Sequence, residues 1–281
     1  MKFDLHSHST ASDGKLAPLA VLQQVEQLGV NLFALTDHDT VSGFLQIKDA
    51  AQSVVLVSGI EFSTQWSGLS IHIVGLDFDA AHPAMSQAIA HQRQVREQRA
   101  YTIDQRLTRE GMPDVLRIAL NYCPDIGQIG RPHFAQAMLD LGYVKTMTHA
   151  FDKWLGSGKL GDVKSVWPDI ATAVEWLHEA GGVAVLAHPL RYKLTFAKLR
   201  RLVQYFQEVG GDAVEVVAQQ GKLDKQQQLV DLVVSLGLAG SGGSDFHEPD
   251  WAWAQLGKVG AMPLGIKPVW ELFQHTQVAG Q

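Results

Sequence analysis

The feature that most constrains the fold is the alternation of short apolar runs with helical patterns. Several runs are β-branched and almost continuously apolar, as buried parallel strands are. Helical patterns lie between most of them, and three of these helices stop at glycines. The seven candidate strands are Lys2–His6, Leu32–Thr36, Val54–Ile60, Ser70–Leu76, Val183–Ala187, Ala213–Val217 and Leu238–Gly242. This alternation predicts an α/β fold with a parallel sheet, and seven strands favour a barrel-like closure.

Two stretches depart from this rhythm. Only a loop, Phe62–Leu69, is expected between the third and fourth strands, which argues against a regular eightfold barrel. Residues 80–160 show mostly helical patterns, with a long helix from about Pro83 to Glu110. We therefore expect a catalytic barrel made of residues 1–79 plus 161–281. The helical insertion, residues 80–160, is expected to form a cap that sets substrate specificity.

Composition narrows the class of protein. The 281 residues are 46% hydrophobic and 19% charged, an ordinary globular balance. The single Cys123 excludes an intramolecular disulfide framework. The polar, histidine-bearing N-terminal sequence is not expected to act as a signal peptide, and no apolar run reaches the roughly 18 residues of a membrane span. The net charge of −6 argues against a duplex DNA surface. We expect a cytoplasmic protein with no membrane, duplex DNA or obligate protein partner.

Histidines and carboxylates gather where the candidate strands end. Six of the seven strands carry such a residue at or near that end, and in barrel-like α/β folds this rim is where active sites assemble. The residues are His6, His8, His38, Glu61, His72, His188, Asp245 and His247, and Asp13 follows the first pair closely. The remaining histidines, apart from His133, fall on helical or exposed stretches and are expected to be ordinary hydrogen-bonded residues.

The residue types indicate metal chemistry. Side chains two apart on an extended segment point the same way, so His6 with His8 and Asp245 with His247 form two ready-made pairs. Mixed imidazole and carboxylate ligands suit Zn, Mn or Fe more than Ca or Mg. About nine candidates exceed the needs of one ion, so two or three ions are implied, with Glu61 and Asp245 suited to bridging. Ions about 3.5–4 Å apart are the usual device for phosphoester hydrolysis.

These motifs resemble the PHP (polymerase and histidinol phosphatase) superfamily. The resemblance covers nearly the whole chain. It is carried by His6-x-His8, Ser12-Asp13-Gly14, Thr36-Asp37-His38-Asp39, Gly59-x-Glu61, His72, Ala187-His188-Pro189 and Gly243-Ser244-Asp245-x-His247. The insertion with Gly130-Arg131-Pro132-His133 resembles the bacterial branch often encoded beside tryptophan genes. That branch hydrolyses nucleoside 3′,5′-bisphosphates and short 5′-phosphorylated RNA. The superfamily fold is a distorted (β/α)7 barrel.

The resemblance also implies roles for individual residues. It implies one metal held by His6, His8, Glu61 and Asp245, a second by Glu61, His72 and His188, and a third by Asp13, His38 and His247. The expected catalytic residues are Asp13, His38, Glu61, Asp245 and His247. The expected cofactors are two or three divalent ions, Mn first, with Fe or Zn as alternatives. Asp37 and Asp39 fit better as partners of the ligands or as turn residues. One departure is Gly161-Asp162-Val163-Lys164, which stands where family members often have an aromatic residue.

Arginines in the insertion suggest how substrate is bound. Seven of the ten arginines lie in residues 91–131, a stretch without lysine. At about 100° per residue, Arg96, Arg99 and Arg106 share an arc with Val95, Ile103 and Leu107. Arginine forks bind phosphate bidentately. We expect Arg96, Arg99, Arg106 and Arg131, together with His133, Asp13 and His38, to contact substrate, and a solvated helix face is the alternative.

Two further features leave alternatives open. Arg131-Pro132-His133 is expected to open a helix, and a helix N-terminus beside an arginine is an anion site. His133 could contact phosphate, act as an acid or be a further metal ligand. Trp251 and Trp253 could stack on a base, although packing is the stronger expectation.

Three functions compete. The first is a metal-dependent phosphoesterase that removes the 3′-phosphate of nucleoside 3′,5′-bisphosphates and also acts on short RNA. The second is a histidinol-phosphate phosphatase, which shares the barrel but not the arginine-rich insertion. The third is a PHP module without catalysis that serves a partner protein, against which the intact ligand set argues.

Overall fold

The chain forms two compact units. A computed structural model describes residues 1–163, 166–217 and 223–278. Met1–Ala88 and Pro168–Gln281 make up the first unit, and Ile89–Trp167 make up the second. No helix among the described residues is long and apolar enough to cross a membrane. The expected role of residues 80–160 as a specificity cap stays a prediction, and Lys164 of the departing motif lies outside the described residues.

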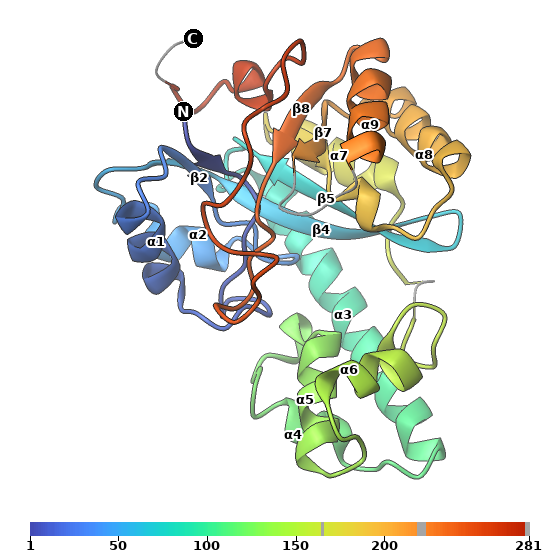
Figure 1. The fold of residues 1–281 in the computed structure, drawn as a ribbon. Coiled ribbons are helices and arrows are strands. Elements are labelled where there is room, and N and C mark those ends of the chain that lie inside the picture. The colour runs from blue at the N-terminus through green and yellow to red at the C-terminus, as the bar shows by residue number, and fades with distance from the viewer. Residues whose placement is uncertain (164–165, 218–222, 279–281) are drawn as a thin grey trace. The chain divides into compact units, whose positions relative to one another are not determined.

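The first unit contains all the strands of the described chain (Figure 1). The strands are β1 Phe3–Asp4, β2 Leu32–Ala34, β3 Val55–Val57, β4 Gly59–Trp66, β5 Leu69–Leu76, β6 Val183–Leu186, β7 Ala213–Val217 and β8 Ala239–Gly242. The helices are α1 Pro18–Gln27, α2 Ser42–Ile47, α7 Ile170–Glu179, α8 Phe196–Glu208 and α9 Leu223–Ser235, with short 3₁₀ turns η3 Pro189–Arg191 and η4 Val269–Leu272. All seven predicted strands exist, although most are shorter than expected.

The sheet is mixed rather than parallel. Strands β1, β2 and β3 pair in parallel, as do β6, β7 and β8. Strand β5 runs antiparallel to both β4 and β6, so the expectation of a wholly parallel sheet is wrong at this strand. The reason is the connection: β4 and β5 form a hairpin, and a parallel neighbour would need a long crossover.

The hairpin also corrects the loop expected at Phe62–Leu69. Strand β4 continues to Trp66, and β5 starts at Leu69. Only Ser67 and Gly68 connect them, with positive φ angles of 49° and 74°. Positive φ at both central residues is the requirement of a type I′ turn, which matches the twist of paired strands.

Backbone contacts join the two sheets into a ring. Beyond β1, the amide of Leu5 donates to the carbonyl of Gly242 at the end of β8 over 3.2 Å. Beyond β2, His38 forms a parallel bridge with Glu61 of β4. Strands β3 and β4 are separated only by Ser58 and act as one bent strand. The ladder therefore passes through seven strand positions and returns to β1, which is a distorted seven-stranded barrel.

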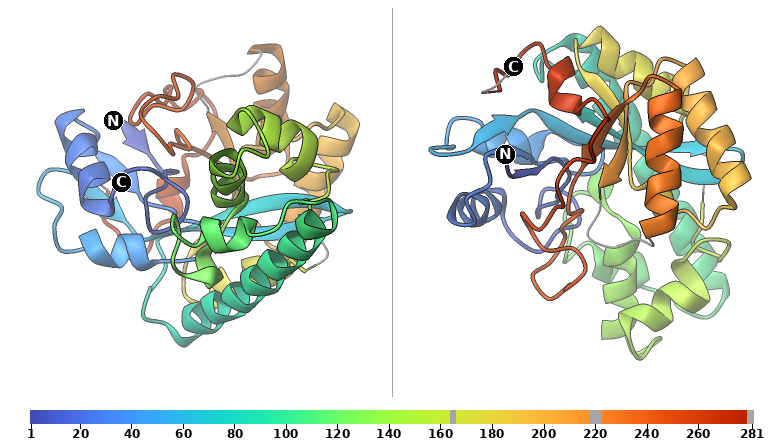
Figure 2. Two further views of the ribbon diagram at one scale, coloured as in Figure 1. Left: turned by 90° about the horizontal axis from the view of Figure 1, so that it is seen from below. Right: turned by 45° about the horizontal axis from the view of Figure 1, so that its top comes forward.

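Burial on both faces explains the continuous apolar runs. In β2 and the residue after it, Leu32 and Ala34 belong to one buried cluster with β1, β5 and β6, whereas Phe33 and Leu35 belong to another cluster with α1. Alternate side chains of a strand point to opposite faces, so both faces are apolar. Helix α7 packs on β4, β5 and β6, and α9 packs on β7 and β8. Helices α8 and α9 lie side by side in both figures of the ribbon (Figures 1 and 2).

The second unit contains helices and turns but no strand in its described part. It holds most of α3 Pro83–Arg109, with α4 Val115–Ala119, α5 Arg131–Asp140 and α6 Met147–Ala150, the 3₁₀ turn η1 Ile126–Gln128 and the π-helical turn η2 Phe151–Leu155. The predicted long helix is confirmed within one residue. Its apolar arc is buried, with Ile103 and Leu107 at 0% exposure, and these side chains pack with Phe134 and Met138 of α5.

Candidate metal centre

The rim of the barrel collects the predicted ligands from six strand positions. His6 and His8 follow β1, His38 follows β2, and His188 follows β6. Glu61 lies in β4, His72 in β5, and Asp245 with His247 follow β8. His72 sits near the start of its strand, because β5 is antiparallel and presents its beginning at the edge where the neighbouring strands end. This explains why His72 is the least terminal of the set.

The most buried group comprises His6, His8, Glu61 and Asp245. Nε2 of His6 and Nε2 of His8 each lie 3.2 Å from Oε2 of Glu61. The same two nitrogens lie 3.3 and 3.1 Å from Oδ1 of Asp245. Four ligand atoms of mixed imidazole and carboxylate type therefore face one small volume, the arrangement that a divalent transition metal requires.

Glu61 connects this group to a second one. Its Oε2 also lies 3.1 Å from Nδ1 of His38. Its Oε1 lies 2.9 Å from Nδ1 of His72 and 3.2 Å from Nε2 of His188. The two oxygens of one carboxylate thus face different histidines, which is the geometry of a bridging ligand.

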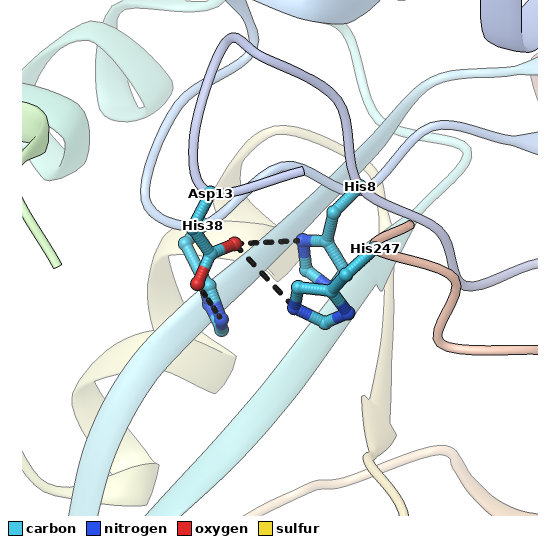
Figure 3. A group of neighbouring side chains, drawn as sticks. All are labelled: His8, Asp13, His38 and His247. Atoms are coloured by element: carbon cyan, nitrogen blue, oxygen red, sulfur yellow. Dashed lines mark ion pairs between the residues drawn. The ribbon is translucent and has the colours of Figure 1, made fainter. Parts of the chain in front are cut away.

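Asp13 lies among three histidines in the third group (Figure 3). Its Oδ1 is 3.4 Å from Nε2 of His247 and 3.9 Å from Nδ1 of His8. Its Oδ2 is 3.9 Å from Nε2 of His38. Asp13 comes from the loop after β1, and the figure shows its carboxylate pointing toward the three rings. All nine predicted metal ligands therefore lie close together, and their role as ligands stays a proposal.

Burial and mutual charge shift the pKa values of this centre. Burial alone lowers the pKa of His8, but hydrogen bonds and charge from Asp245 and Glu61 raise it to about 10. Burial raises the pKa of Glu61, but the charges of the neighbouring imidazoles His6 and His38 outweigh this effect and lower the pKa to well below its usual range. Burial lowers the pKa of His38 to about 3. Divalent ions held here would supply positive charge beside the buried carboxylates.

Unsatisfied buried atoms provide a test of whether metals fit. Four buried side-chain atoms of this centre have no hydrogen-bond partner: Nδ1 of His8, Nδ1 of His38, Oε2 of Glu61 and Nδ1 of His188. Buried polar atoms normally have partners. Oε2 of Glu61 lacks one although three imidazole nitrogens lie within 3.2 Å of it. Atoms placed this closely without hydrogen bonds fit metal ligation.

Asp37 and Asp39 hold segments that carry ligand candidates. Oδ1 of Asp37 accepts hydrogen bonds from the amide of Ser9 and the hydroxyl of Ser12, over 2.8 and 2.7 Å. Asp39 accepts from the amide and hydroxyl of Ser63 in β4. Both aspartates are fully buried. The expectation that they support the ligands rather than join them agrees with these contacts.

Two residues of the centre have left-handed backbone conformations. His188 has a φ of 31° and Asp245 a φ of 52°. Such conformations cost a non-glycine residue of order 1–3 kcal/mol and cluster at functional sites. A Cβ at Gly243 would lie 2.3 Å from Cβ of His6, so the chain can approach His6 this closely only because residue 243 is glycine.

Two residues of the centre escaped the sequence analysis. Oε1 of Glu215 accepts a hydrogen bond from Nδ1 of His6, and Oε2 accepts from the amide of His188 over 2.6 Å. Arg191 forms an ion pair with Oδ2 of Asp245. A signal existed for Glu215, because a charged residue interrupts the apolar strand β7. The signal for Arg191 is weaker: it lies three residues after a ligand candidate.

The arginines of the second unit are bonded inside that unit. Arg96 and Arg99 are only 5% and 6% exposed, so the prediction that they share the buried, apolar arc of α3 is confirmed. Nε of Arg99 donates to the carbonyl of Val163, and both guanidinium groups lie over the ring of Trp167. Arg106 and Arg131 donate to the carbonyls of Leu160 and Leu155. Their predicted contact with substrate stays a prediction.

The remaining candidates have defined positions. His133 lies in the first turn of α5, where its Nδ1 accepts from the amide of Gly130 over 2.9 Å, so the expected helix start is confirmed. The three groups above do not include His133. Trp251 and Trp253 stack on each other with ring centroids 4.8 Å apart, which agrees with the packing expectation.

Comparison with known proteins places the chain. A family model described as PHP domain matches residues 4–155. A 5′-3′ exoribonuclease from Haemophilus influenzae is 42% identical, covering 97% of this chain and 99% of the relative. A 3′,5′-nucleoside bisphosphate phosphatase from Chromobacterium violaceum is 36% identical, covering 95% and 94%.

A solved structure agrees with the sequence relatives. An amidohydrolase from Chromobacterium violaceum, with bound sulfate and no metal, has a TM-score of 0.88 at 35% identity, covering 97% of this chain and 96% of that one. A protein from Bifidobacterium adolescentis has the same fold, with a TM-score of 0.77 at 24% identity over 95% and 92% of the two chains. The histidine and carboxylate groups at the barrel rim and these similarities lead to one conclusion: the chain belongs to the PHP domain family.

Proposed function

We propose that this protein hydrolyses the 3′-phosphate of nucleoside 3′,5′-bisphosphates, releasing inorganic phosphate and the nucleoside 5′-phosphate. A water oxygen bonds to phosphorus, the bond from phosphorus to the 3′ oxygen breaks, and the 3′ oxygen gains a proton. The observation that carries the proposal is the sharing of Glu61 by histidines from four strand positions. Relatives that span almost the whole chain and are named for phosphatase or exoribonuclease activity support it.

Two or three divalent ions, with Mn as the proposed metal, would be held by His6, His8, Asp13, His38, Glu61, His72, His188, Asp245 and His247. Such ions lower the pKa of water toward neutral and stabilise charge on phosphoryl oxygens. Nδ1 of His6 donates to Glu215, and Nδ1 of His247 donates to the carbonyl of Asp245. These bonds leave the Nε2 lone pair of each neutral ring facing the carboxylates, the orientation that a ligand needs.

The same centre could act on short 5′-phosphorylated RNA. This second candidate is favoured by the relatives named 5′-3′ exoribonuclease, one of which is 42% identical. Both reactions break a bond between phosphorus and a 3′ oxygen, so one metal centre can serve both. A nucleotide and a short RNA are therefore the proposed partners of the protein.

Phosphate release from adenosine 3′,5′-bisphosphate, from adenosine 3′-monophosphate and from histidinol phosphate, under identical metal and salt, tests the first activity. We expect the bisphosphate to exceed the two monophosphates in kcat/KM by about 10²–10⁴, the effect of two charged contacts to a second phosphate. Higher efficiency on histidinol phosphate would contradict the proposal. Degradation of an oligoribonucleotide with and without a 5′-phosphate tests the second activity.

A further inference from the structure

The two oxygens of Asp245 face different surroundings. Oδ1 lies 3.1 and 3.3 Å from the Nε2 atoms of His8 and His6, inside the centre. Oδ2 is paired with Nη1 of Arg191, which comes from η3. A guanidinium group therefore reaches the centre beside a carboxylate that we propose as a metal ligand.

Aromatic rings position this guanidinium. Cζ of Arg191 lies 4.9 Å from the ring centroid of Trp253. Trp253 stacks on Trp251 with an interplanar angle of 21°, and Trp251 lies 5.4 Å from the ring of His247. The two tryptophan rings therefore connect Arg191 with His247, another residue of the centre. Contact between a cation and an aromatic face restrains the guanidinium plane while its N–H edges stay available.

Arg191 keeps donors for a further anion. Its side chain is 33% exposed, whereas that of Asp245 is 10% exposed. Oδ2 of Asp245 is its one hydrogen-bond acceptor among the residues that the structure describes. A guanidinium has five N–H groups in a fork that matches the oxygens of phosphate. A divalent ion ligated by Asp245 would compete with Arg191 for the negative charge of this carboxylate. The guanidinium group would then be free to pair with another anion.

We propose that Arg191 binds a non-bridging oxygen of the phosphate group that is hydrolysed, with Trp253 as its positioning residue. The proposal rests on the proposed phosphoesterase function and adds a substrate contact to it. The alternative is that Arg191 only holds the carboxylate of Asp245 in place. The two roles differ in a measurable way, because a holding role affects metal content and a binding role affects phosphate affinity.

The test uses the metal-loaded protein with inorganic phosphate as the probe. Calorimetric titration gives phosphate affinity, and elemental analysis gives metal content. In Arg191→Met we expect wild-type metal content and phosphate binding weaker by about 10- to 100-fold, the loss of a charged hydrogen bond. Trp253→Leu should show a smaller loss of phosphate affinity.

Arg200→Met is the matched control, because Arg200 lies over Phe196 of α8 in a similar contact, with Cζ 5.7 Å from the ring centroid. Wild-type phosphate affinity in metal-loaded Arg191→Met would overturn the proposal.

Should Arg191→Met fail to hold metal, Arg191→Lys becomes the test, since lysine keeps a charge for Asp245 but lacks the planar fork. Weaker phosphate binding at full metal content supports the proposal, and unchanged binding overturns it. Phosphate binding does not depend on which ester is cleaved, so failure of the bisphosphate assay would refute the proposed function without deciding the role of Arg191.

Kinetics separate the reacting phosphate from the second phosphate. If Arg191 binds the reacting group, Arg191→Met raises KM by the same factor for adenosine 3′-monophosphate and for the 3′,5′-bisphosphate. A rise confined to the bisphosphate would place the contact on the 5′-phosphate and overturn the assignment.

Discussion

Oε1 of Glu215 lies 2.7 Å from Nδ1 of His6, and both side chains are buried in the barrel. The glutamate also accepts a hydrogen bond from the amide of His188, whose φ is 31°. One carboxylate on β7 therefore orients a ligand candidate after β1 and a second one after β6. Carboxylates that hold ligand histidines in this way fix the ring orientation and increase ligand basicity.

The first prediction concerns this carboxylate. Glu215→Gln keeps the shape of the side chain but removes its charge, so we expect metal affinity to fall by about 10- to 100-fold. Competition with a chelating dye measures the affinity. Glu208→Gln on the exposed end of α8 is the control and should leave it unchanged. Equal metal affinity in the wild type and Glu215→Gln would show that Glu215 does not support the centre.

The second prediction concerns the arginines of the second unit. Arg99 is buried and donates to the carbonyl of Val163, so Arg99→Ala leaves an acceptor unpaired and should destabilise this unit by about 1–3 kcal/mol. Hydrogen–deuterium exchange of α5 should then be roughly 5- to 100-fold faster, with α8 unaffected. Arg117, whose side chain is 67% exposed, is the control. Unchanged exchange in Arg99→Ala, together with a raised KM for bisphosphate, would instead indicate that Arg99 serves substrate binding alone.

The third prediction concerns pH. Nε2 of His178 lies 2.8 Å from Oδ2 of Asp212, and this hydrogen bond raises the pKa of His178 above its usual value. A raised folded-state pKa adds stability that is present below the unfolded pKa of about 6.5 and is lost as the pH rises through the folded value. We expect His178→Gln to melt about 1–2 °C below the wild type at pH 5.5, since the pair is partly exposed. The difference should vanish at pH 9, and one that persists there would exclude the ion pair as its cause.

Much of the fold could be predicted because apolar periodicity reports directly on burial. Leu32 to Leu35 form a continuous apolar run since both faces of β2 are covered, and this makes the strand visible in the sequence. The direction of β5 could not be predicted in the same way, because an apolar run does not state which way a strand runs. The dipeptide Ser67-Gly68, which forms the type I′ turn between β4 and β5, was the one local signal for a hairpin.

Some residues of the candidate site could be predicted from local sequence spacing, and others could not. The motif pairs His6 with His8 and Asp245 with His247 are local in sequence, so their spacing alone brings them together. Glu215 and Arg191 act through partners that are 209 and 54 residues distant, His6 and Asp245. Such contacts depend on how the barrel closes, which no local pattern contains.

Metal dependence of 3′-phosphate hydrolysis is the central claim, and phosphate release from adenosine 3′,5′-bisphosphate tests it most directly. The assay compares purified protein, chelator-treated protein, chelated protein refilled with Mn, and Asp245→Asn, which keeps the shape but removes a charged ligand. We expect at least two metal equivalents in the active protein, loss of hydrolysis on chelation, recovery on refilling, and a fall of at least about 10² in kcat for Asp245→Asn. Full turnover in the metal-free protein or in Asp245→Asn would contradict the account.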